Sequence, residues 1–72
     1  MTLTLTVNGE RCDYPTDSAG AFTVVALLAQ LKLTGQPCAV EVNKALVPKR
    51  NHESHQLRDG DTVEIVTLVG GG

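Results

Sequence analysis

The chain has 72 residues, of which 42% are hydrophobic and 19% charged, and its formal net charge is −2. A chain of this length forms one small domain that buries about 60% of its unfolded surface, which leaves little room for an enclosed catalytic cleft. The acidic balance, with one Tyr, one Phe and no Trp, argues against a nucleic-acid partner, which requires basic patches and stacking platforms. No apolar run is long enough to span a membrane and no signal-like leader opens the chain, so we expect a cytoplasmic protein.

The first fourteen residues predict a β-hairpin. Thr2 to Val7 alternates polar and apolar residues, as in a half-buried strand. Asn8-Gly9 follows, and both residues tolerate the positive φ angles of a type I′ turn. Glu10 to Tyr14 is then expected to return as the second strand, with Cys12 and Tyr14 on one face.

A loop from Pro15 to Ala21 is expected to lead into one helix. Thr23 is placed to cap its N-terminus, because a threonine hydroxyl can accept a hydrogen bond from a backbone N–H of the first turn. The helix carries one apolar stripe at i, i+3, i+4 and i+7, which consists of Val24, Leu27, Leu28 and Leu31. Gly35 and Pro37 are expected to end it.

The second half of the chain predicts further strands separated by polar turns. The expected strands are Cys38 to Val42, a brief Leu46-Val47 ended by Pro48, and Thr62 to Val69. The turns are expected at 43–45, 49–56 and 59–61, with Leu57 filling a core site between them.

The order of these elements indicates an α+β fold, in which one main helix packs across one face of a mixed β-sheet. If the last strand lies beside the first, the two run parallel in the middle of the sheet, which is the β-grasp arrangement. We therefore expect a single domain over residues 1–69 and a flexible, exposed glycine tail over residues 70–72.

The terminal run Gly70-Gly71-Gly72 is the most distinctive feature of the sequence. Three residues without side chains extend roughly 10 Å, so they can enter a slot too narrow for any residue with a Cβ. A carboxylate at Gly72 would be a poor electrophile and would need activation, most directly as an acyl-adenylate formed with ATP. A partner enzyme must supply that activation, so the pattern indicates a carrier rather than a catalyst.

The last predicted strand presents two faces. The inward set comprises Val63, Ile65, Thr67 and Val69, and the outward set comprises Glu64, Val66 and Leu68. Because an outward face is usually polar in a monomer, Val66 and Leu68 are candidates for a partner interface, together with Glu64 and Val69. Asp59 and Asp61 lie nearby, and they either steer the tail toward a basic surface or form a solvated turn.

The sequence contains no convincing catalytic or metal-binding constellation. His52 and His55 have the spacing of one helix face but lack a third ligand, so we interpret both as exposed surface histidines. Cys12 and Cys38 form no CxxC motif, and we interpret them as reduced core residues, with redox or sulfur chemistry as the alternative. We therefore expect no catalytic residue, no metal and no bound cofactor.

Over nearly its whole length the sequence resembles the ThiS family, the ubiquitin-like sulfur carrier proteins of thiamine biosynthesis. The matching segments are Asn8-Gly9, Thr23 to Leu28, Ala39 to Asn43, Val47 to Lys49, and Asp59 to Gly72, the last being the most specific. There are two departures. The connection from Pro15 to Phe22 looks longer than usual, as expected for a surface insertion, and Lys49 stands where an arginine is expected.

This resemblance implies a β-grasp fold and sulfur chemistry at the C-terminus. An adenylyltransferase of the ThiF type would adenylate Gly72 with ATP, and a sulfur-transfer step would convert it to a thiocarboxylate. A thiazole synthase of the ThiG type would take the sulfur to build the thiazole ring. Gly71 completes the diglycine of the family, Gly70 extends the reach, and the free carrier is expected to be a monomer.

Three alternatives remain open from the residues alone. One is the small subunit of molybdopterin synthase, which has the same fold, tail and chemistry. Another is a ubiquitin-like interaction module that is never activated. The third is a protein modifier in which Gly72 forms an isopeptide bond with a lysine. The segments Val47 to Lys49 and Val63 to Val69 favour the thiamine carrier over the first of these.

Overall fold

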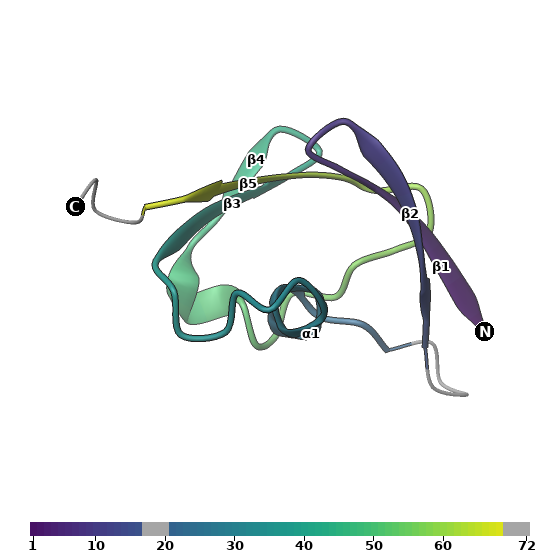
Figure 1. Ribbon diagram of the computed structural model, residues 1–72, viewed down its shortest axis with the longest axis horizontal. Coiled ribbons are helices and arrows are strands. Elements are labelled where there is room, and N and C mark those ends of the chain that lie inside the picture. Colours follow the sequence, from purple (N-terminus) through teal and green to yellow (C-terminus); the bar gives the residue numbers. More distant parts are fainter. Residues whose placement is uncertain (17–20, 69–72) are drawn as a thin grey trace.

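The computed structural model describes residues 1–16 and 21–68. Within this part of the chain, five strands form one sheet and one α-helix lies across a single face of it (Figure 1). The elements in chain order are β1 (Thr2–Val7), β2 (Glu10–Pro15), α1 (Val24–Gln30), β3 (Cys38–Val42), β4 (Ala45–Val47), the short 3-10 helix η1 (Lys49–Asn51) and β5 (Thr62–Thr67).

The strand order β2-β1-β5-β3-β4 places β5 in the centre of the sheet. β1 and β5 run parallel, with Thr6 opposite Thr62 and Val7 opposite Val63. All other neighbouring strands are antiparallel, so the sheet is mixed as the element order predicted. This arrangement is the ubiquitin-like β-grasp fold.

Two tight turns close the hairpins of the sheet. Asn8 and Gly9 have φ angles of 51° and 82°, so the predicted left-handed turn between β1 and β2 is confirmed. Asn43 and Lys44 repeat this geometry between β3 and β4, with φ angles of 51° and 70°. The Asn43 side chain also accepts a hydrogen bond from the Thr62 N–H at 3.0 Å, which ties this turn to the start of β5.

The helix begins where the sequence predicted and ends earlier. The Thr23 hydroxyl accepts a hydrogen bond from the Ala26 N–H at 3.2 Å, which confirms Thr23 as the N-cap. The expectation that Gly35 and Pro37 end the helix is wrong. Lys32 adopts a φ of 60°, and the Leu33 N–H donates to the Leu28 C=O at 2.8 Å, which closes the helix with a Schellman motif.

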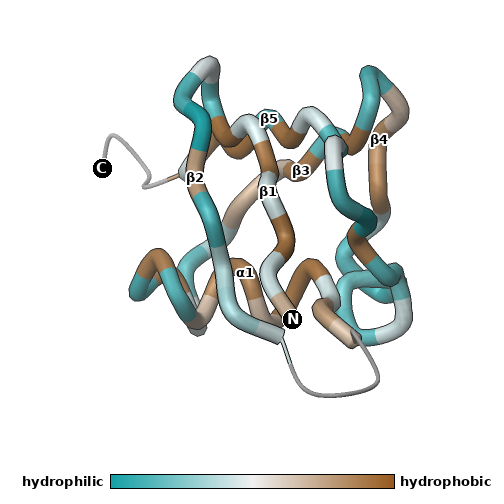
Figure 2. Tube along the Cα trace, turned by 90° about the vertical axis from the view of Figure 1, so that its right-hand side faces the viewer, coloured by the Kyte–Doolittle hydropathy of each residue, from teal (hydrophilic) through white to brown (hydrophobic). Residues whose placement is uncertain are grey.

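The core lies between α1 and the inner face of the sheet, and Figure 2 shows hydrophobic residues alternating along β1 above the helix. Leu5, Val24, Leu27, Val40 and Val63 are fully buried there. Leu57 is also buried, as predicted.

The expectation that His52 is an exposed surface residue is wrong, because its side chain is only 6% exposed. The chain after η1 folds back over the core, and the ring Nε2 lies 3.0 Å from the Val47 C=O. A carbonyl oxygen can only accept, so Nε2 carries a proton and donates this hydrogen bond. His55 was also expected to be exposed, and it is half-buried instead.

Candidate functional site

The outer face of the sheet lies opposite α1. It carries Glu64, Val66 and Leu68, which the alternating pattern of the last strand predicted to point outward. Val66 and Leu68 are 58% and 55% exposed. Glu64 is also exposed, and it lies directly opposite Glu41 across the β3–β5 pair. These residues form the candidate docking face, which ends where the chain passes to residue 69. Val69, Gly70, Gly71 and Gly72 lie outside the described residues.

Leu46 belongs to the same outer face but was not singled out from the sequence. It is 66% exposed on β4, where it lies opposite Glu41. The signal was present in Ala45-Leu46-Val47, because a buried Val47 requires its neighbour to point the other way in a strand. The strand is too short for its alternation to stand out from the flanking turns.

The inward set of β5 is buried only as far as Ile65. Thr67 was expected to continue this set, but its side chain is exposed. It lies opposite Cys38, and both residues are near the end of the sheet, past the buried core positions of β3 and β5. Burial of the inward-facing side chains therefore ends at Ile65, two residues before β5 ends at Thr67.

Hydrogen bonds hold β5 in place up to Leu68. The Leu68 N–H donates to the Pro37 C=O at 2.8 Å. On the other side of the strand, the Ile65 N–H donates to Oδ1 of Asn8 at 2.7 Å. The sheet therefore determines the position and direction of the chain as far as Leu68.

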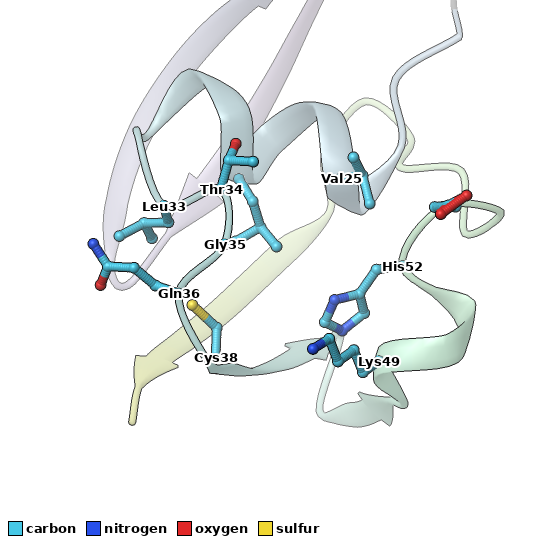
Figure 3. A pocket seen from close by; sticks show the side chains of 10 residues that line it. Val25, Leu33, Thr34, Gly35, Gln36, Cys38, Lys49 and His52 are labelled. Carbon is cyan, nitrogen blue, oxygen red and sulfur yellow. The ribbon is translucent and has the colours of Figure 1, made fainter. Parts of the chain in front are cut away.

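A cavity of about 190 Å³ lies on the inner side, between α1, the connection to β3, and η1 (Figure 3). Its lining includes Cys38, Lys49 and His52. A cysteine–histidine catalytic pair would require a hydrogen bond between the two side chains, and none joins Cys38 to His52 within the described segments.

Asp59 and Asp61 build the turn before β5. Oδ1 of Asp59 accepts a hydrogen bond from the Thr4 N–H at 2.7 Å, and Oδ2 of Asp61 accepts one from the Arg58 N–H at 2.8 Å. Oδ1 of Asp61 also accepts a bond from the Asn43 side chain at 3.0 Å. Both carboxylates therefore have a structural role, as in the turn interpretation of the sequence.

Cys12 and Cys38 are both free and half-buried against the core. Among residues 1–16 and 21–68, no three His, Cys, Asp or Glu side chains are grouped to hold a metal ion. No helix in these segments is long and apolar enough to cross a membrane.

Comparison with known proteins connects this geometry to a family. The family model described as the ThiS family matches residues 5–72. The sulfur carrier protein ThiS of Bacillus subtilis is 35% identical over 94% of this chain and 98% of its own length. The crystal structure of the thiamine biosynthesis protein ThiS from Geobacter metallireducens superposes with a TM-score of 0.73, at 32% identity, over 97% of this chain and 100% of the other.

A longer protein also contains a segment like this one. The thiazole synthase of Paramagnetospirillum magneticum is 38% identical over 94% of this chain, but the match spans only 20% of that enzyme. With the family model covering the chain almost from end to end and the fold agreeing, the chain belongs to the ThiS family.

Proposed function

We propose that this protein is a sulfur carrier of thiamine biosynthesis, which carries sulfur as a thiocarboxylate on Gly72. The observation that supports this most strongly is the family match through residue 72, which includes the glycine run. The run follows a central strand whose last described residue, Leu68, is hydrogen-bonded to the sheet. The domain thus supplies a rigid, recognisable body, and the glycines supply reach.

The chemistry follows from the weak reactivity of a carboxylate. An oxygen of the Gly72 carboxylate attacks the α-phosphate of ATP and releases pyrophosphate, which leaves an acyl-adenylate. Hydrosulfide then attacks the acyl carbon and displaces AMP, and loss of the sulfur-bound proton leaves a thiocarboxylate. The carrier binds no cofactor in this scheme, because ATP is held by the activating enzyme. Gly70 and Gly71 allow the chain to lie in a slot without a Cβ clash.

Two partner enzymes are required by this scheme. An adenylyltransferase of the ThiF type activates Gly72, and a thiazole synthase of the ThiG type receives the sulfur. The occurrence of a ThiS-like segment within a longer thiazole synthase supports the second partner, since it joins the two activities in one polypeptide. We place the reaction in the cytoplasm and expect the free carrier to be a monomer.

The candidate docking face is the surface that these enzymes would contact. Val66 and Leu68 present apolar area at the C-terminal end of the described chain, and Glu64 adds a negative charge. An exposed apolar patch with a charged residue at its border is typical of a protein–protein contact. The patch lies on the opposite side of the sheet from α1, so a partner can cover it without disturbing the core.

Intact mass spectrometry after incubation with a ThiF-type enzyme, ATP and a sulfur source tests the proposal. We expect a species about 16 Da heavier, because one oxygen is replaced by sulfur, and we expect fragmentation to map it to Gly72. The Gly71→Val chain serves as the control and should stay unmodified. If the complete chain binds the enzyme but never gains mass, it is an interaction module rather than a carrier.

A further inference from the structure

Among the described residues, no strand lies beside one side of the second half of β5. β1 pairs with β5 only through Thr6 and Val7, and the chain then turns away at Asn8. On the other side, β3 continues along β5 as far as Thr67. Figure 1 shows β5 running on past the β1–β2 turn toward its C-terminal end. Residues 65–68 therefore form an open edge on the central strand of the sheet.

The hydrogen bonds determine which backbone groups face this open edge. The Val63 C=O accepts from the Asn8 N–H at 2.9 Å, and the Ile65 N–H donates to the Asn8 side chain. Because backbone groups alternate sides along a strand, the Ile65 C=O and both backbone groups of Thr67 point the same way. In the segments that the structure describes, these three groups have no hydrogen-bond partner. Among the described residues, the Asn8 side chain is the last partner of β5 on this side.

The outer edges of the sheet are protected against strand addition, and this edge is not. β2 carries three charged residues and one proline, which are Glu10, Arg11, Asp13 and Pro15. β4 has three residues and is followed at once by Pro48. Charges, prolines and short strands discourage pairing with another chain. Residues 65–68 read Ile-Val-Thr-Leu, which are uncharged and mostly favour β-structure.

We propose that this open edge accepts one extended strand of the enzyme that activates Gly72, an inference that rests on the proposed function. The added strand bonds to the Ile65 C=O and to the N–H and C=O of Thr67, and it lies beside Val66 and Leu68 of the candidate docking face. The edge leads directly to residue 69, so the added strand aligns the chain for entry into the activating site. A second copy of this chain fits less well, because so short an edge gives a homodimer few bonds and little buried area.

The variant Thr67→Pro tests the hydrogen bond directly. Proline removes the N–H that faces the open edge, whereas the bond on the β3 side is made by the neighbouring Leu68 N–H, which donates to the Pro37 C=O. We expect binding to a ThiF-type enzyme to weaken about tenfold, as for the loss of one interfacial hydrogen bond. Thr67→Val keeps the N–H and the branched shape, and it should bind within about twofold of the parent chain.

Amide hydrogen exchange on the unsubstituted chain gives a second measurement that does not depend on a variant. We expect the Thr67 N–H to exchange at least about tenfold more slowly once the enzyme and ATP are added. The Val66 N–H faces β3 and should be protected in both states.

A complex that forms while Thr67 exchanges as fast as in the free chain overturns this inference and leaves the proposed function standing. Failure of the unsubstituted chain to bind the enzyme at all overturns both. Protection of Thr67 that appears without enzyme and rises with protein concentration identifies a second copy as the occupant, and it also overturns the inference.

Discussion

The substitution Leu68→Asp separates docking from folding. Burying a whole leucine side chain contributes about 1.5–3 kcal/mol. Leu68 is 55% exposed, so a partner that covers it can gain roughly 0.8–1.7 kcal/mol. Aspartate loses this gain and also places a charged group in an apolar contact, which costs at least about 1 kcal/mol more. We therefore expect the affinity for the ThiF-type enzyme to fall by at least about 20-fold.

The same substitution should change the stability of the free protein only slightly. Leu68 is absent from the buried core and lies one residue beyond β5. We expect the melting temperature to fall by less than about 5 °C, since 1 kcal/mol corresponds to about 4–8 °C in a domain of this size. Isothermal titration calorimetry measures the affinity and differential scanning calorimetry the melting temperature.

Leu46→Asp is the matched control for this experiment. Leu46 is 66% exposed on the same face, but it lies on β4, two strands away from β5. We expect its substitution to change the affinity by less than about threefold, because a solvated rim position contributes little to binding. Normal binding by Leu68→Asp, or a large loss of its stability, would refute the assignment of Leu68 to a docking surface.

Further predictions concern the tail, the helix and the pH dependence of stability. Gly71→Val should leave the melting temperature unchanged and abolish ATP–pyrophosphate exchange with the activating enzyme; ordinary turnover would refute the narrow slot. Thr23→Ala should lower the unfolding free energy by about 1 kcal/mol, because the Ala26 N–H loses its cap. Urea titration measures this loss, and Thr23→Ser should retain most of the stability. Burial raises the pKa of the Tyr14 hydroxyl, and Cys12 and Glu10 raise it further. The resulting stabilisation of the folded state is fully present below the pKa of tyrosine in the unfolded chain, about 10, and it is lost as the pH rises through the pKa of Tyr14 in the folded state. Alkali should therefore destabilise the parent chain more than the Tyr14→Phe variant. Equal alkaline losses in urea titrations of the two chains would contradict this reasoning.

Local patterns in the sequence were enough to predict most elements. The Asn8-Gly9 turn and the Thr23 cap depend on contacts within a few residues, and both were found as predicted. Local reasoning was wrong at the helix end, because Lys32 took the left-handed position that is usually occupied by glycine. It was also wrong for His52, which is buried because the chain after η1 folds over the core.

The sequence by itself determined the family resemblance, the strand faces and the glycine run, since each of these is carried by neighbouring residues. Only the tertiary structure decided where β5 gains and loses its partners. Thr6 lies beside Thr62 although the two are far apart in sequence, and β1 stops before β5 does. Such pairings depend on how all the elements bury their apolar faces together, and alternation within one strand carries no information about its neighbours. For this reason the open edge at residues 65–68 became visible only when the sheet was assembled.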